Sequence, residues 1–411
     1  MIFFTDAITR KCSESKQSLQ VLFVIILVTL QFEEHNIGDI SVFRLIILPL
    51  SILGFLKTFS FKHNKRCKSV QILFLVLLTY LFIVCSFLGT ISDSINKLLL
   101  IPFTLFLTFC FCDDEIKRVR YDRIFLWGPF ASFIAWITGY GYKETVRFCG
   151  IYFDPNFLCI FCILGAVSKI VFLPHIKNKW EKLIYIILLC IDLYEIFISQ
   201  SRGGILVILI IGSIYIMKVV NNTIYRVLLM VPTIVIGFYI WNYAQTLTMW
   251  SSAYDNTADQ ILSRMKYSEL ESGGGRTGMW EKCINYINEN GSFFVPVGHS
   301  NLYRYNGNFD THNSFLDFLS DAGYFVFLVF FIPLLYHLLL FYRKNFSFSI
   351  PPEDVFLAMI SIAMMLLSFF LSYYTWKIFW LPLIIAWCLP GKTSIHYKKL
   401  RLQTNDNNDK K

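Results

Sequence analysis

The stretch VQILFLVLLTYLFIVCSFLG, residues 70–89, contains no charged side chain. An α-helix rises about 1.5 Å per residue, so an apolar run of this length can cross the ~30 Å hydrocarbon core of a bilayer. Similar runs recur along the 411 residues, of which 55% are hydrophobic and 16% charged, whereas soluble domains average ~25% charged residues. The sequence therefore predicts an all-α, polytopic membrane protein.

The apolar runs also predict how the chain crosses the membrane. We expect about 12 transmembrane helices, at residues 19–32, 37–56, 70–89, 95–112, 124–142, 155–173, 180–199, 203–218, 224–243, 322–342, 353–373 and 376–390. Most of the 37 lysines and arginines fall in loops on one side of this arrangement. Because cytoplasmic loops carry an excess of basic residues, both termini are expected in the cytoplasm.

One loop on the opposite side is long. Residues 244–321 separate a nine-span region (1–243) from a three-span region (322–391), and the polar tail 392–411 is expected to be disordered. Connections longer than ~12–15 residues are usually functional or disordered, and this one is rich in aromatic residues. Its segment SGGGRTGMWEKCINYINENG, residues 272–291, predicts an amphipathic helix that stops at the final asparagine-glycine pair.

Arginine is rare in the short outer loops, so each occurrence needs a partner. Arg202 lies in SQSRGG, residues 199–204, between two apolar runs. A buried arginine costs about 2.5–3.5 kcal/mol on insertion scales unless an anion or a carboxylate meets it. Two interpretations remain open: an ion pair with Glu195 or Asp192 of the preceding span, or an anionic ligand, with Glu195 holding the guanidinium for it.

Three further arginines are candidate ligand-binding residues on the same side. Arg147 lies in RFCGIYFDPN, where a glycine turn and an Asp-Pro helix start would place it against the next span; a snorkelling interfacial arginine is the alternative. Arg276 and Trp280 are four residues apart and share a helix face, which suits clamping an anion but also suits a solvated first turn. Arg304 is another outer cation.

A histidine lies where the long loop meets the next apolar run, in DTHNSFLDFLSDAGYF, residues 310–325. If this segment is helical from its start, His312 shares a stripe with Phe315, Leu316, Leu319 and Gly323, while Asp317 and Asp321 lie on the opposite side. His312 is then either a hydrogen-bonded structural residue or a catalytic base. His299, between two small residues in an expected loop, is a weaker candidate.

Several arginines and a histidine on one face suit a lipid-linked pyrophosphate. Arginine donates paired hydrogen bonds to phosphate oxygens, and a histidine with a pKa near ~6.5 can accept a proton from a sugar hydroxyl. The cysteines of Cys159-x-x-Cys162 lack zinc-ligand companions, and no acidic cluster suits a divalent cation, so no metal and no cofactor are expected. Basic residues are dispersed, which disfavours nucleic-acid binding.

Four short elements together resemble the bacterial O-antigen polymerase and O-antigen ligase superfamily of membrane glycosyltransferases. They are RFCGIYFDPNFL, SQSRGG, GGRTGMW and HNSFLDFLSDAGYF, which occur in family order within residues 145–340. Val326 occupies the place of a second glycine that often follows Gly323 in the family.

The resemblance implies a GT-C-like enzyme in the bacterial inner membrane, acting on undecaprenyl-pyrophosphate-linked glycans at the periplasmic face. By the same resemblance Arg202 and Arg276 would bind pyrophosphate, Arg147 would assist, and His312 would be the base or its close partner; Asn313, Trp280, Arg304 and Glu195 are further substrate-binding candidates. Membrane lipid and a chain-length regulator protein are candidate partners.

Three alternatives stay open at this stage. Within the superfamily, a polymerase is favoured over a ligase because the divergent motifs fit the more variable group. A lipid-linked sugar transporter belongs to another class, but such transporters usually contain internal repeats, and none is found in this sequence. A receptor that senses an anion through the long loop is the third alternative.

Overall fold

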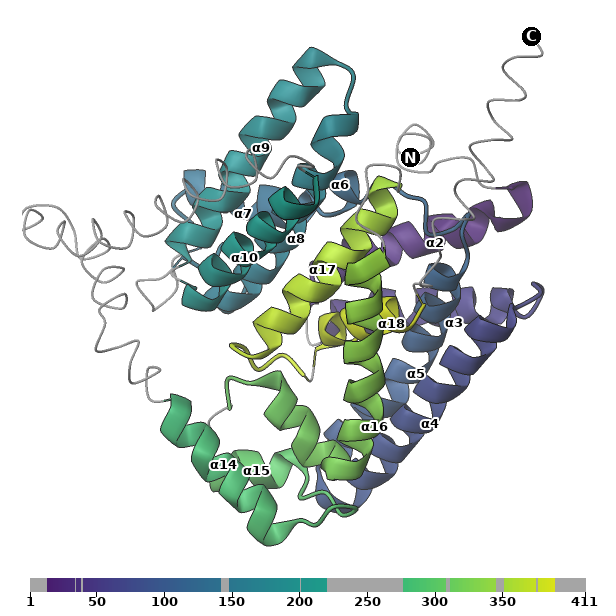
Figure 1. The fold of residues 1–411 in the computed structure, drawn as a ribbon, viewed down its shortest axis with the longest axis vertical. Coiled ribbons are helices and arrows are strands. Elements are labelled where there is room, and N and C mark those ends of the chain that lie inside the picture. The colour runs from purple at the N-terminus through teal and green to yellow at the C-terminus, as the bar shows by residue number, and fades with distance from the viewer. Residues whose placement is uncertain are drawn as a thin grey trace, which may run out of the picture.

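The structure is a computed structural model, which describes residues 13–33, 35–37, 40–141, 148–199, 201–219, 276–307, 311–344, 351–374 and 376–388. It is built almost wholly of helices (Figure 1). The helices are α2 (Glu14–Leu30), α3 (Leu48–Thr58), α4 (Lys65–Leu88), α5 (Ile91–Cys112), α6 (Tyr121–Ile124), α7 (Trp127–Ile137), α8 (Pro155–Phe172), α9 (Lys179–Ile198), α10 (Arg202–Val219), α14 (Arg276–Asn290), α15 (His299–Tyr305), α16 (Ser314–Lys344), α17 (Pro352–Ser368) and α18 (Trp380–Cys388).

Within the described residues, four helical segments are long and apolar enough to cross a membrane, which confirms the predicted class. They are Lys65–Leu88, Ile91–Cys112, Pro155–His175 and Ser314–Ile332. The apolar helices Gly203–Ile216 and Lys377–Cys388 are shorter. Helix α7 replaces the predicted span 124–142 but has only 11 residues, and therefore covers ~17 Å, about half the hydrocarbon core. The predicted count of twelve spans is not confirmed, and the span 224–243 lies outside the described residues.

Two predicted spans begin or end differently from the expectation. The start of span 37–56 is a two-stranded hairpin, β1 (Asn36–Ile37) and β2 (Ile40–Ser41), followed by a π-helical turn, η1 (Phe43–Ile47). Span 353–373 ends early, because α17 stops at Ser368 and an irregular turn follows. That turn, residues 369–374, becomes part of the candidate site described below. The short 3₁₀ turns η2 (Leu173–His175) and η4 (Lys377–Phe379) extend α8 and precede α18.

Helix α16 is broken by Gly323, whose φ of 71° and ψ of 165° are not helical. The part after this glycine corresponds to the predicted span 322–342, whereas the part before it is a separate helical turn that the hydropathy pattern did not predict. A positive φ is accessible to glycine without steric cost, so this residue lets the chain change direction at the start of the apolar run 322–342.

The polar contacts gather at two opposite ends of the helices. At one end the start of α2 meets the end of α5, where Lys16 Nζ lies 2.7 Å from Asp113 Oδ2, and Lys117 Nζ lies 3.0 Å from Asp354 Oδ1 at the start of α17. At the other end α14 and α15 lie beneath α16 and near the ends of α4 and α5 (Figure 1). Each of these two ends therefore contains segments that the sequence predicts on the same side of the membrane.

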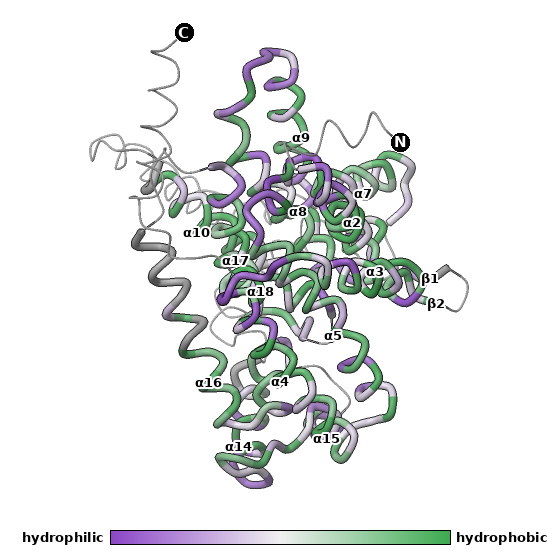
Figure 2. The backbone as a smooth tube through the Cα atoms, turned by 90° about the vertical axis from the view of Figure 1, so that its right-hand side faces the viewer, coloured by the Kyte–Doolittle hydropathy of each residue, from purple (hydrophilic) through white to green (hydrophobic). Residues whose placement is uncertain are grey.

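The core lies where α16, α17 and α18 pass between α3–α5 and α7–α10 (Figure 1). Phe318 is fully buried there, with the rings of Tyr374 and Phe330 at 5.6 and 5.9 Å. Figure 2 shows hydrophobic residues along most of the helices in the middle of the molecule, with hydrophilic residues in α14 at one end. This core supports the site at the α14–α15 end.

Candidate functional site

Arg202 is the first residue of α10. Ser201 precedes it, and the Ser201 side-chain oxygen accepts a hydrogen bond from the Gly204 N–H at 3.3 Å, which is the contact of an N-cap residue. The two glycines allow close packing: a Cβ on Gly203 would lie 2.7 Å from Phe370 Cβ, and one on Gly204 would meet the Cys159 sulfur. The helix start that carries Arg202 is therefore packed against the turn 369–374 and against α8.

Helix α14 brings Trp280 to the segment that carries His312. The predicted amphipathic helix and its glycine stop are confirmed, because α14 ends at Asn290 and the Gly291 N–H donates to the Ile287 carbonyl at 2.9 Å. Trp280 Nε1 donates a 2.8 Å hydrogen bond to the carbonyl of Thr311. Since Arg276 begins α14 one turn before Trp280, its backbone also lies near this segment.

His312 is not part of a helix, so the helical-wheel interpretation was wrong. Its φ of 52° puts it in the left-handed region, which non-glycine residues seldom occupy. Helix α16 begins only at Ser314, and Asn313 caps it: the Asn313 side-chain oxygen accepts from the N–H groups of Phe315 at 3.0 Å and Leu316 at 3.2 Å. His312 lies just outside the helix with an exposed side chain, whereas Asn313 is buried.

The turn 369–374 joins the His312 segment to the Arg202 helix. Ser314 donates through its backbone N–H at 2.9 Å and its hydroxyl at 2.6 Å to the Leu371 carbonyl. The Asn313 N–H donates to the Ser372 hydroxyl at 3.2 Å. Because Phe370 of the same turn packs on Gly203, the backbones at residues 202, 280 and 312 lie in one neighbourhood.

A buried polar cluster lies directly beneath this neighbourhood, and the sequence analysis missed it. His299 Nδ1 lies 3.6 Å from Asp317 Oδ1, and the His299 backbone N–H donates to Asp321 Oδ1 at 2.6 Å. Asp317 and Asp321 are both buried and one turn apart on α16. His299 was expected in a loop but is the first residue of α15.

The second carboxylate, Asp321, also meets a lysine and a tyrosine. Lys97 Nζ of α5 lies 3.7 Å from Asp321 Oδ2 and 3.8 Å from the centre of the Tyr374 ring, and the Tyr374 hydroxyl donates to Asp321 Oδ2 at 3.0 Å. A buried carboxylate is stable only with such partners. Two acidic residues within an apolar segment indicate that each has a buried partner, but the sequence did not identify those partners.

The two buried carboxylates of α9, Asp192 and Glu195, contact residues of α8. Asp192 Oδ2 lies 2.6 Å from Lys169 Nζ of α8, a partner that the sequence analysis did not consider. Glu195 is fully buried and accepts a 3.2 Å hydrogen bond from the Cys162 thiol, and its Oε1 has no partner among the described residues. The side chain of Arg202 lies outside what the structure describes, so a contact with Glu195 stays a prediction.

The remaining predicted residues are placed as follows. Arg147 lies outside the described residues, but the turn after it is as expected: Gly150 has a φ of 60°, and the Asp154 side chain caps α8 by accepting from the Asn156 N–H at 2.7 Å. Arg304 is exposed in the last turn of α15. The side chain of Arg276 is not described.

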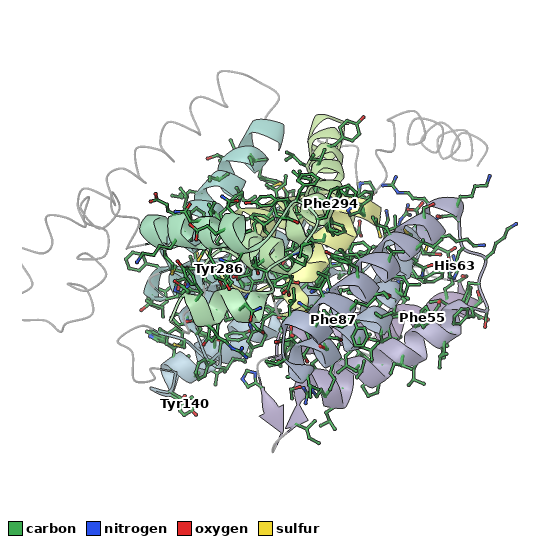
Figure 3. All side chains as sticks on the ribbon, turned by 90° about the horizontal axis from the view of Figure 1, so that it is seen from below. Phe55, His63, Phe87, Tyr140, Tyr286 and Phe294 are labelled. Atoms are coloured by element: carbon green, nitrogen blue, oxygen red, sulfur yellow. The ribbon has the colours of Figure 1, made fainter. Side chains whose placement is uncertain are left out.

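The electrostatic field of Asp317 reaches α14. Burial and the nearby Asp317 carboxylate raise the pKa of the Cys283 thiol to about 11. Cys283 packs with Ile287, Leu302 and Leu319 in a small hydrophobic cluster that joins α14, α15 and α16. In the view from the α14–α15 end, the side chains of Tyr286, Phe294 and Phe87 lie on the face towards the viewer (Figure 3). The Asp317 carboxylate therefore lies close to this hydrophobic cluster.

Residues 184–331 match the family model described as O-antigen ligase. Over these residues the chain is similar to the O-antigen ligase family. The match includes Arg202, Arg276, His299 and His312 and confirms the resemblance to the O-antigen polymerase and ligase superfamily over this part of the chain. No curated protein matches the chain. Members of this family are glycosyltransferase-like membrane enzymes, and His299, Asp317 and Asp321 lie within the matched residues.

Proposed function

We propose that the protein is an O-antigen polymerase, which joins oligosaccharide repeat units carried on undecaprenyl pyrophosphate. The observation that carries the proposal is the meeting of the Arg202 helix start, the Trp280 side chain and the His312 segment within the residues similar to the O-antigen ligase family. The divergent motifs fit a polymerase, the more variable branch of the superfamily.

The helix start at Arg202 suits an anionic leaving group. The first N–H groups of α10 carry a partial positive charge, which attracts phosphate even without a side chain. Arginine adds a planar fork that donates paired hydrogen bonds to phosphate oxygens. Arg276 would supply a second guanidinium from α14, and Arg147 a third. Together these charges would offset the charge that develops on pyrophosphate, so the proposed reaction needs no metal.

The proposed reaction is a direct glycosyl transfer. A hydroxyl oxygen of the acceptor glycan attacks the anomeric carbon of the donor, the bond from that carbon to the pyrophosphate oxygen breaks, and undecaprenyl pyrophosphate leaves with both electrons. The acceptor hydroxyl loses its proton to a base, for which His312 or a close partner of it is proposed. Its left-handed backbone is held by the hydrogen bonds of Thr311 and Asn313, which fixes where the imidazole projects.

We place this reaction at the periplasmic face of the bacterial inner membrane. The α14–α15 end carries the candidate site, whereas the opposite end gathers Lys16 and Lys117 with their carboxylates. Basic residues concentrate on the cytoplasmic side, so the site end would face the periplasm.

The test uses a strain that lacks this protein. Loss of long-chain glycan, with lipid A core bearing a single repeat unit, supports a polymerase; unmodified core with accumulated lipid-linked polymer indicates a ligase. Arg202→Ala, Arg276→Ala and His312→Ala should fail to restore the chain-length ladder, whereas Arg118→Ala, exposed at the opposite end, should restore it. Full ladders from all three variants would refute the enzyme proposal.

A further inference from the structure

We propose that His299, oriented by Asp317, is the base that accepts the proton of the attacking hydroxyl. The inference rests on the proposed function and names the group that this function leaves open. It starts from a residue that looked like an ordinary loop histidine in the sequence and that the fold places against a buried carboxylate.

The geometry is that of a base held by a third group. His299 Nδ1 is a buried atom that makes no hydrogen bond to any described residue, and the nearest carboxylate oxygen, Asp317 Oδ1, lies 3.6 Å away. This separation is within ion-pair range but longer than a hydrogen bond, as is common in catalytic pairs before substrate binds. With Nδ1 turned to Asp317, Nε2 is the nitrogen left for substrate, and 16% of the side-chain surface is exposed.

Asp317 is itself held in place. Its Oδ1 accepts a 2.7 Å hydrogen bond from the Thr311 hydroxyl, and the Thr311 carbonyl accepts from Trp280 Nε1. Thr311 therefore links the Asp317 carboxylate to helix α14, which begins at Arg276. Thr311 is also the residue directly before His312. In known acid–base pairs such a carboxylate fixes the tautomer of the imidazole and stabilises the imidazolium that forms.

The backbone around His299 is fixed without use of its imidazole. The His299 N–H donates to Asp321, the Gly298 N–H donates to the Ser320 carbonyl at 2.8 Å, and the Ser300 hydroxyl donates to Asp93 Oδ2 at 2.6 Å. These bonds hold α15 against α16 and α5. The imidazole is therefore not needed to hold α15 in place.

The surroundings favour proton transfer at the ring. The charged and titratable groups around it are Asp317 and Asp321 on α16, Lys97 on α5, and Tyr303 and Tyr374, whose rings lie 6.5 and 6.1 Å from the imidazole. Lys97 is paired with Asp321, whereas the carboxylate beside the His299 ring is that of Asp317. The proton passes from the acceptor hydroxyl to Nε2 as the glycosidic bond forms and leaves to solvent after the product departs.

The experiment measures polymer formation by the purified full-length protein in lipid vesicles supplied with lipid-linked repeat units. His299→Ala should lower kcat by about 100-fold or more with KM nearly unchanged, the effect expected on removing a general base. Added imidazole should restore part of that rate, because it can enter the space left by the ring and accept the proton. It should not restore His312→Ala. Asp317→Asn should lower kcat in the same direction, and Arg118→Ala, exposed at the opposite end of the molecule, should retain the wild-type rate.

The outcomes separate the two proposals. If the wild-type protein forms no polymer, the proposed function fails. If it forms polymer and His299→Ala keeps its rate within about threefold, or if imidazole rescues His312→Ala and not His299→Ala, the assignment of His299 is overturned. Should His299→Ala fail to fold, His299→Gln is measured instead: a lowered kcat at unchanged KM supports the assignment, and a wild-type kcat overturns it.

Discussion

Thr311→Val should loosen the start of α16, because the buried Thr311 hydroxyl bonds both to the carboxylate beside His299 and to the backbone next to His312. The Thr311 hydroxyl donates to Asp317 Oδ1 at 2.7 Å and accepts from the Asn313 N–H at 3.1 Å. Valine has nearly the same shape but makes neither bond. A hydrogen bond to a charged group contributes about 1.5–3 kcal/mol and a neutral one about 1 kcal/mol, so the loss should be at least about 2 kcal/mol.

The loss can be measured locally by hydrogen exchange and mass spectrometry of the peptide that contains residues 311–316. Since each 1.4 kcal/mol is a factor of ten, about 2 kcal/mol should speed exchange of the amides that open with this segment by about 30-fold. Thr311→Ser keeps the hydroxyl and is the matched control, while protection in α4 should stay unchanged. Exchange in Thr311→Val within about twofold of the wild-type rate would refute the reasoning.

Three further predictions concern the packing around the site. Cys283, with its pKa of about 11, should react with an alkylating reagent at pH 8 at least about 100-fold more slowly than an ordinary thiol. The reaction should become faster as the pH rises towards 11, and it should be faster in Asp317→Asn. Ordinary reactivity at pH 8 would contradict this prediction. Lys169→Met leaves Asp192 buried without its cation and should cost about 3–5 kcal/mol of stability, measured as a lower thermal unfolding temperature in detergent. The double variant Lys169→Met with Asp192→Leu should recover most of that stability. An equal loss of stability in the single and the double variant would count against the ion pair. Gly150→Ala should lower the yield of folded protein, because the φ of Gly150 is 60° and the new Cβ would lie 2.5 Å from Ser132 Cβ. If Ser132→Gly restored the full yield, the contact alone would explain the loss and backbone strain would contribute nothing.

Local signals predicted local structure well. The apolar run 70–89 lies in α4 except for its last residue, Gly89, which caps the helix; the Asp-Pro pair at 154–155 begins α8, and the glycine at 291 ends α14. Each signal acts through neighbours in sequence: hydropathy over one helix, a side chain that caps its own helix, and a residue that cannot continue one. Such features need no knowledge of the rest of the fold.

Other expectations failed because a nearby residue changed the backbone. The helical wheel for His312 assumed a helix that begins before it, but Asn313 caps α16 and His312 takes a left-handed φ. The spans around α7 and α17 were expected to be longer, since hydropathy alone does not reveal where a helix bends or stops.

By itself, the sequence determined that the chain is a helical membrane protein, which residues cap or end several helices, and which family its central segment resembles. Only the tertiary structure decided the partners of the buried charges: His299 with Asp317, Lys97 with Asp321, and Lys169 with Asp192. Lys97 and Asp321 lie far apart in the sequence, whereas the other two pairs meet because consecutive helices fold back on each other, α9 on α8 and α16 on α15. In an apolar interior a charge must find its counterpart wherever packing brings one within reach, and packing is a property of the whole fold.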